Sequence, residues 1–107
     1  MAGTPLRLHG PALVSNVAAT KYTVPAGRRT IVRHIRVANT AAGAATLTLS
    51  IGADAAGTRV YEVFSIAASS IEDRWVYFVL AAAEIIAGLS GTNNVLTLTI
   101  NGDEQIV

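Results

Sequence analysis

The chain of 107 residues contains no cysteine, and it has few charged and few aromatic residues. Without cysteine there can be no disulfide, no thiolate metal ligand and no cysteine nucleophile. Charged residues make up 14% of the chain, well below the roughly 25% that is usual in soluble domains. So little charge suggests that neighbouring molecules cover part of the surface.

Long hydrophobic runs are also missing. The longest apolar run, residues 75–83, is about half the length of a membrane span. The first ten residues show no basic segment followed by an apolar stretch. We therefore expect a soluble protein without a cleaved signal peptide and without a membrane partner.

The charges that are present divide unevenly along the chain. Residues 1–53 contain six basic residues and no acid, whereas residues 54–107 contain seven acids and two arginines, so that charges of +6 and −5 combine to the net charge of +1. If the two halves formed different faces, copies of the chain would attract one another through complementary patches. If instead the strands interleave, the charges mix in space, and the sequence leaves both possibilities open.

Turn signals recur about every ten residues, and short runs between evenly spaced turns are typical of a sandwich or barrel. They lie at Gly10-Pro11, Pro25-Ala26-Gly27, Ala42-Gly43, residues 52–57, residues 67–70, residues 91–94 and Asn101-Gly102. The predicted strands are residues 5–9, 12–16, 21–24, 29–39, 45–51, 59–66, 71–80, 84–89 and 95–101. A short helix competes with the strand at "AAAEIIAGL", but its shortness and its glycine favour the strand.

These strands predict an all-β fold: a single-domain, antiparallel, jelly-roll-like β-sandwich of about eight strands. Residues 21–107 would form its core, and residues 1–20 an N-terminal arm with the first strands, placed to pack on neighbouring subunits. The clearest strands alternate, with one apolar face on each. These faces consist of Leu47, Leu49 and Ile51 in the first strand and of Leu96, Leu98 and Ile100 in the second.

The same two strands begin near-identical octets, "LTLSIGAD" (residues 47–54) and "LTLTINGD" (residues 96–103). Each octet is expected to end in a glycine-containing turn that carries an aspartate. The octets are either equivalent strands of a duplicated sandwich or a coincidence in a chain rich in threonine and leucine.

The run from Tyr22 to Asn39, "YTVPAGRRTIVRHIRVAN", breaks the simple alternation. Strict alternation would place Arg33 on the same face as the apolar Ile31 and Ile35. Arg33 therefore lies beyond the core, or a β-bulge near it resets the alternation, or other chains partly cover both faces of the strand. We prefer the last two explanations.

The sequence contains no grouping of side chains that signals catalysis, and we expect no catalytic, cofactor-binding or metal-binding residue. The two histidines, His9 and His34, lack the spacing of a metal site. "GADAAG" has no lysine to complete a phosphate-binding loop. Glu72 and Asp73 are adjacent on a strand and so point to opposite faces. A small hydrolase would require a polar cleft in which His34 lies within hydrogen-bonding reach of a carboxylate.

The candidate partner-binding residues are cations and aromatic rings, and they are Arg28, Arg29, Arg33, Arg36, Trp75 and Tyr77. The arginines are expected to contact acidic groups on neighbouring chains. Direct binding of nucleic acid is not expected, because the net charge is near zero and stacking aromatics are scarce. Trp75 and Tyr77 share a strand face, where such a pair fills a core or an interface more often than it stacks on a sugar.

Several stretches between Tyr22 and Glu104 combine into a larger pattern: "YTVPAG" before "TIVRHIRVANT", then "LTLSIGADAAGTRVY", "LAAAEIIAG" and a closing "LTLTINGDE". In this order of strands and turns the chain resembles small structural proteins encoded by tailed bacteriophages. In many of them a glycine precedes the acid of the turn that here reads Ala83-Glu84, so the chain departs from the pattern at Ala83.

The resemblance implies a virion component without enzymatic activity, made in the host cytoplasm. Such proteins decorate the outer surface of the head, commonly as trimers, or belong to tails and fibres. It favours a head decoration or cement protein, a homotrimer that binds the major capsid protein or other virion proteins and stabilises the shell. The alternative is a tail or fibre component that adheres to a host glycan.

Overall fold

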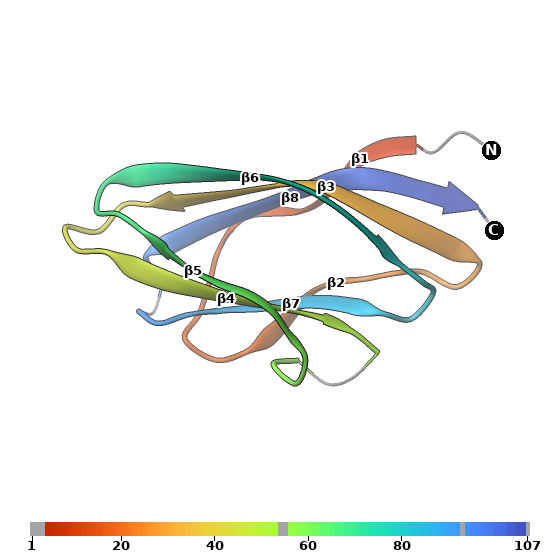
Figure 1. Cartoon of the computed structure of the whole chain (residues 1–107), viewed down its shortest axis with the longest axis horizontal. Helices are drawn as coiled ribbons and strands as arrows, with labels where there is room; N and C mark the ends of the chain where they lie inside the picture. The colour runs from red at the N-terminus through yellow and green to blue at the C-terminus, as the bar shows by residue number, and fades with distance from the viewer. Residues whose placement is uncertain (1–3, 54–55, 93, 107) are drawn as a thin grey trace.

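The chain folds into two antiparallel β-sheets that stack face to face (Figure 1). The computed structural model describes residues 4–53, 56–92 and 94–106, and within these ranges it contains eight strands and no helix. The strands are β1 (Thr4–Leu13), β2 (Ala19–Thr23), β3 (Arg28–Asn39), β4 (Ala45–Gly52), β5 (Val60–Ile66), β6 (Ser70–Leu80), β7 (Ile85–Ser90) and β8 (Leu96–Ile106). The predicted all-β, single-domain sandwich of about eight strands is confirmed.

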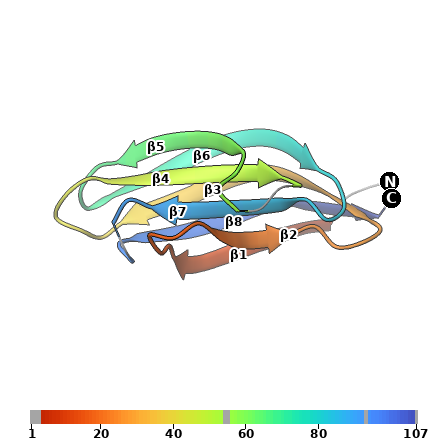
Figure 2. The same ribbon diagram turned by 90° about the horizontal axis from the view of Figure 1, so that it is seen from below.

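The strand order is β1-β8-β3-β6 in one sheet, here called sheet A, and β2-β7-β4-β5 in the other, sheet B. The first strand therefore pairs with the last, β2 with β7, β3 with β6, and β4 with β5. This nested pairing gives the sandwich a jelly-roll-like topology. As a result β3, from the basic half of the chain, lies between β6 and β8 from the acidic half (Figures 1 and 2).

The core fills the space between the sheets with aliphatic side chains. Alternation places Leu47 and Leu49 inward from β4, and Leu96, Leu98 and Ile100 inward from β8, and all five are at most 1% exposed. Ile51, the third residue predicted to face inward from β4, is half-buried and packs against this core. The faces predicted for these two strands are therefore confirmed. The other fully buried side chains of large volume are Ile35, Ile66, Leu80, Ile86, Val14, Val24 and Val32.

A β-bulge at Arg33 resolves the broken alternation of β3. The register of β3 shifts between Val32 and His34 against both of its neighbours, β6 and β8. Before the shift Val32 points into the core, and after it Ile35 does, while Arg33 is exposed. The bulge is one of the two explanations preferred from the sequence, and it turns the side chain of Arg33 outward without leaving a charge in the core.

Two predicted turns are wrong. The sequence predicts separate strands at residues 5–9 and 12–16, but β1 runs through Gly10-Pro11 with irregular register, and it ends at Leu13. Asn101-Gly102 lies within β8, which continues to Ile106. The octet at residues 96–103 therefore does not end in a turn, whereas β4 ends at Gly52, so the expected likeness of the two octets fails at their ends.

A charged cluster lies where the sheets meet along β5 and β6, the two edge strands on one side. The Arg74 guanidinium bonds Glu62 of β5 at 2.8 Å, contacts Glu72 at 3.5 Å, and lies 4.4 Å from the centre of the Phe64 ring. Inward-pointing charges discourage an edge strand from pairing with another chain. This cluster therefore fits an edge that is not extended by a further strand.

The turn between β6 and β7 contains Ala83, the residue at which the sequence departs from the phage pattern. The backbone of Ala83 has φ = 71°, the left-handed region that favours glycine. Its N–H donates to the Val24 carbonyl at 3.0 Å, and the Glu84 carboxylate accepts from the Ala81 N–H at 2.6 Å. These bonds keep Ala83 in the strained conformation.

We predict that Ala83→Gly raises the melting temperature by roughly 2–4 °C, because glycine removes strain of about 1–2 kcal/mol at a partly offsetting entropic cost. The reverse exchange, Gly27→Ala, is the matched control. Gly27 has φ = 74° and nothing within 4 Å of an added Cβ, so its substitution introduces only backbone strain. Thermal unfolding should move in opposite directions for the two variants, and a lower melting temperature for Ala83→Gly would contradict the explanation.

Candidate functional site

Five of the six predicted partner-binding residues lie on the outer face of sheet A, the face turned away from sheet B. Arg29, Arg33 and Arg36 project there from β3, and Trp75 and Tyr77 from β6. We call these five residues the arginine–aromatic face. The bulge is necessary for it, because without the shift Arg33 and Arg36 would point to opposite sides of the strand.

Arg28 is the exception. It lies on the same side of β3 as Thr30 and Val32, which are buried between the sheets. Its guanidinium lies 3.6 Å from the Glu104 carboxylate. The hydroxyl of Tyr22 donates to the same carboxylate at 3.1 Å, and burial is the main cause that raises the pKa of Tyr22. Arg28 thus belongs to a polar cluster at one end of the core and not to the arginine–aromatic face.

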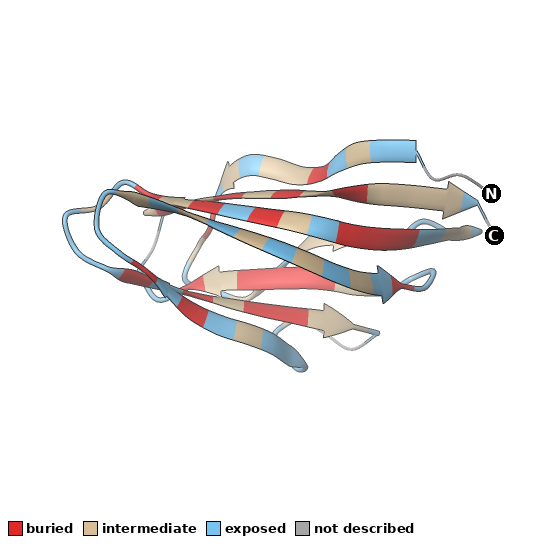
Figure 3. Ribbon diagram, turned by 45° about the horizontal axis from the view of Figure 1, so that its top comes forward, coloured by how far each residue is buried: buried red, intermediate tan, exposed pale blue. Residues whose placement is uncertain are grey.

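The two aromatic rings are unusually exposed. Trp75 is 80% and Tyr77 66% accessible to solvent, and exposed and half-buried positions alternate along β6 (Figure 3). Trp75 stacks one side of its indole on His34, with ring centres 4.2 Å apart, and the Arg33 guanidinium lies 5.5 Å from the Tyr77 ring centre. Within one chain these rings fill no core, so much of their surface is open to contact with another molecule.

Partners within the chain hold the arginines of this face in place. Arg33 bonds Asp103 at 2.5 Å, and Arg36 bonds both carboxylate oxygens of Asp73, at 2.8 and 3.2 Å. These hydrogen bonds from Arg36, with a further one from His34, hold the pKa of Asp73 below its usual value, and Asp73 in turn raises the pKa of Arg36. The acids come from the second half of the chain, so the interleaved arrangement of charge is the one observed.

Arg29 is different because its partner is neutral. Its guanidinium donates to the side-chain oxygen of Gln105 at 2.9 and 3.2 Å. Arg29 therefore keeps its full positive charge at the surface, and of the three arginines on the arginine–aromatic face it is the one with no carboxylate partner in the described part of the chain.

The geometry that a hydrolase would require is present in part. His34 borders an open depression, and its Nε2 lies 2.8 Å from a carboxylate oxygen of Asp73. However, the amide nitrogen of Asn101 lies 3.1 Å from Nδ1 and can only donate, so Nδ1 accepts and Nε2–H donates to Asp73. Both ring nitrogens are occupied, and neither is left to take a proton from a nucleophile.

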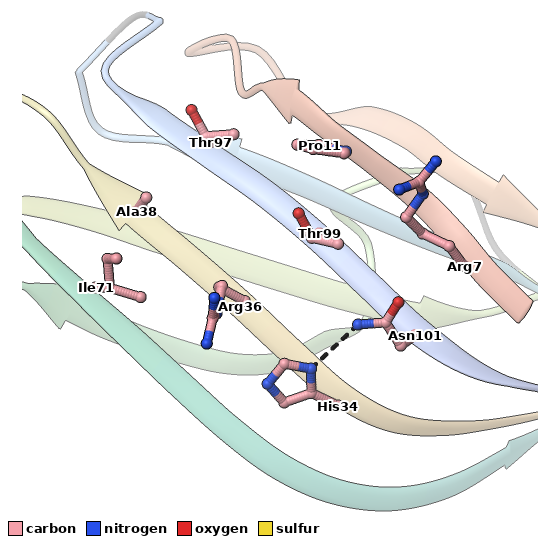
Figure 4. A pocket seen from close by; sticks show the side chains of 9 residues that line it. All are labelled: Arg7, Pro11, His34, Arg36, Ala38, Ile71, Thr97, Thr99 and Asn101. Carbon is pink, nitrogen blue, oxygen red and sulfur yellow. Dashed lines mark hydrogen bonds between the residues drawn. The ribbon is translucent and has the colours of Figure 1, made fainter.

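The depression lies across the outer face of sheet A and has a volume of about 420 Å³. Its lining comes from all four strands of the sheet (Figure 4), and consists of Arg7, Pro11, His34, Arg36, Ala38, Ile71, Thr97, Thr99 and Asn101. We call it the sheet A groove. Trp75 is not one of the lining residues, but its ring stacks on His34, which is. Strand pairing brings these residues together, and nothing in the sequence alone marked Arg7, Thr97, Thr99 or Asn101 as site residues.

The other histidine lies apart from this groove. His9 is half-buried on β1, and its pKa is lowered, mainly by burial and also by the charge of Lys21. Among the described residues there is no group of three or more histidine, cysteine or acidic side chains arranged to hold a metal ion. No helix in the described ranges has the length and hydropathy needed to cross a membrane.

Comparison with known proteins gives little. No protein-family model and no curated protein matches the chain in sequence. Two solved structures of a pentameric capsid protein from metagenomic phage sequences are similar at 13% and 14% identity, with TM-scores of 0.35 and 0.33, and the match covers 96% of this chain. The chain spans 60% and 62% of those chains. TM-scores this low do not establish a common fold, so function rests on the chain's own surface.

Proposed function

We propose that the chain is a structural component of a tailed-phage virion, and that it is a head decoration or cement protein that binds the capsid surface through the arginine–aromatic face. The observation that carries this proposal is the exposure of Trp75 and Tyr77 beside arginines that are already held in place. The resemblance of the sequence to small phage structural proteins supports the assignment to a virion.

The chemistry of this face suits a protein interface. Aromatic and arginine side chains dominate the binding energy of many interfaces. Because Asp103 and Asp73 hold Arg33 and Arg36, these side chains lose little conformational freedom on binding. The balanced charges also favour a protein surface over nucleic acid, which would require several uncompensated cations.

The proposed mechanism is mechanical and includes no catalytic step. A protein that binds only the assembled shell shifts the equilibrium toward that shell by mass action. A homotrimer located over a junction of capsid subunits would contact several of them at once, and the N-terminal residues 1–20 would add contacts to neighbouring subunits. The partners would be the major capsid protein or other virion proteins.

We predict that Trp75→Ala/Tyr77→Ala weakens binding to particles prepared without this protein by at least about thirtyfold, the loss typical of interface hot spots. Co-sedimentation with the particles measures the affinity. Val63→Ala is the matched control, because Val63 is a 55% exposed apolar residue on sheet B. Arg29→Glu should weaken binding as well, and it breaks no ion pair within the described chain because the partner of Arg29 is the neutral Gln105. Unchanged binding of the double variant would refute the proposal.

The second candidate function is that of a tail or fibre component that adheres to a host glycan. The sheet A groove favours it, because an open depression that presents hydroxyl, amide and guanidinium groups next to an exposed tryptophan offers hydrogen bonds and a stacking surface together. The two candidates place different molecules against the same sheet.

A further inference from the structure

The sheet A groove contains one positive charge that nothing in the described chain balances. Arg7 lines the groove from β1, and no carboxylate of the described residues lies within ion-pair distance of it. Its pairing partner across the strands is the neutral Asn101. Arg36, the other arginine of the groove, is bound to Asp73. A ligand of this groove would therefore bind most tightly if it placed a single negative group near Arg7.

The middle of the groove offers neutral hydrogen-bonding groups in a regular row. Thr97, Thr99 and Asn101 occupy alternate positions of β8 and lie along the groove (Figure 4). Alternate residues of a strand are about 6.8 Å apart. No hydrogen bond within the described residues engages the two threonine hydroxyls, and Asn101 uses its amide N–H on His34 while its oxygen stays available.

Trp75 adds a stacking surface at the side of the groove. One side of its indole lies against His34, and the side chain as a whole is 80% exposed. A row of hydroxyl and amide groups beside an open aromatic ring matches a sugar, which has hydroxyls at its edge and an apolar face. The uncompensated Arg7 selects among sugars, because guanidinium groups bind carboxylates with two parallel hydrogen bonds.

Other ligand classes fit this groove less well. An extended peptide gains affinity from free backbone groups at a sheet edge, but six of the nine residues that line the groove lie on β8 and β3, whose backbones pair on both sides. Nucleic acid would present several phosphates to a groove with one uncompensated cation.

We infer that the sheet A groove binds a carboxylate-bearing sugar unit of an acidic glycan. The carboxylate pairs with Arg7, the hydroxyls bond Thr97, Thr99 and Asn101, and a neighbouring sugar ring stacks on Trp75. This inference deepens the second candidate function and rests on it for the location of the site in the virion. Binding of the sugar itself does not depend on where in the virion the protein is located.

The test uses the single tryptophan of the chain, Trp75, as its reporter. Oligogalacturonate, oligoglucuronate and sialyllactose are titrated while tryptophan fluorescence is followed, and fully methyl-esterified oligogalacturonate serves as the neutral counterpart. We expect a saturable change with at least one acidic sugar, and at least tenfold weaker binding for the matching uncharged form.

Two arginine variants then localise the site. Arg7→Ala should weaken binding of the acidic sugar by roughly tenfold or more, the effect of removing a hydrogen bond to a charged group. Arg29→Ala, which removes an exposed arginine of the same sheet outside the groove, should leave it unchanged. No saturable change with any of the three sugars, equal loss in both variants, or equally tight binding of polyglutamate would overturn the inference.

Particle binding separates this inference from the decoration role. Arg7→Ala should co-sediment with particles as the unchanged protein does. If Trp75→Ala/Tyr77→Ala keeps its particle binding while Arg7→Ala loses the sugar, the decoration role fails and the glycan site stands. If no sugar binds while Trp75→Ala/Tyr77→Ala no longer co-sediments with the particles, the glycan site fails and the decoration role stands.

Discussion

Gly102→Ala will destabilise the fold by about 3 kcal/mol or more, the upper part of the range for overpacking a well-packed interior, and will lower the melting temperature by on the order of 10 °C or more. A Cβ on Gly102 would overlap the carbonyl oxygen of Ile31 and would lie 3.1 Å from Leu8. The first atom belongs to the backbone of the adjacent strand and cannot turn aside as a side chain can. Thermal or urea unfolding measures the loss.

Gly43→Ala is the matched control for this substitution. Gly43 lies between β3 and β4 with nothing within 4 Å of an added Cβ, so the same methyl group should change the stability very little. If Gly102→Ala melted within a few degrees of the unchanged protein, the close approach of β8 to β3 would be refuted.

The same glycine connects the fold to the arginine–aromatic face. Gly102 pairs with Val32, at the point where the register of β3 shifts around Arg33. Moving β8 away from β3 would disturb the bulge that turns Arg33 outward, and with it the bond from Arg33 to Asp103. We therefore expect a folded fraction of Gly102→Ala to bind particles more weakly than the unchanged protein.

Alternation was the most informative signal in the sequence. In β8 as far as Gly102, and in β4 as far as Leu49, buried residues alternate with more exposed ones, because one side of each strand faces the core. In β3 the alternation fails at Arg33, and this failure itself indicated a bulge. An interruption of the alternation in an otherwise regular strand was thus as informative about the structure as unbroken alternation.

Turn chemistry was the least reliable signal. Asn-Gly is a favoured hairpin dipeptide, yet Asn101-Gly102 lies within β8. Gly102 stands there because the neighbouring backbone leaves no room for a side chain, which is the other reason for a glycine in a strand. Local sequence cannot separate these two causes, since the second depends on β3, a strand far away in the chain.

The sheet A groove depends on pairing even more strongly. Arg7, Arg36 and Thr99 are separated by many residues and share no motif, and only the order β1-β8-β3 brings them to one face. The aromatic pair on β6 could be recognised from spacing alone. Their exposure could not, because the same alternation describes a strand that faces a core and one that faces solvent.

Asn39→Asp will also be strongly destabilising, by about 3 kcal/mol or more, the cost of a buried charge and unmade hydrogen bonds. Asn39 ends β3 and is 2% exposed. Its amide nitrogen donates to the carbonyl oxygens of Gly43 and Ile66 at 3.0 Å and Ala67 at 3.2 Å, and its oxygen accepts from the Ala41 N–H at 2.9 Å. One side chain thus connects the β3–β4 and β5–β6 turns.

The dependence on pH distinguishes this cause from a simple loss of packing. A carboxylate held against three carbonyl oxygens is less stable than its protonated form, so the pKa of the carboxyl group introduced by Asn39→Asp will be raised in the folded state. Such a group lowers the free energy of unfolding at neutral pH, where it is ionised. Part of this loss is recovered as the pH falls through the raised pKa of the folded state toward the lower pKa of the unfolded chain. The melting temperature of Asn39→Asp should therefore rise, relative to the unchanged protein, between pH 7 and pH 5. Asn39→Ala, which removes the same donors without adding a charge, should show no such rise, and parallel curves for the two variants would contradict the role assigned to the amide.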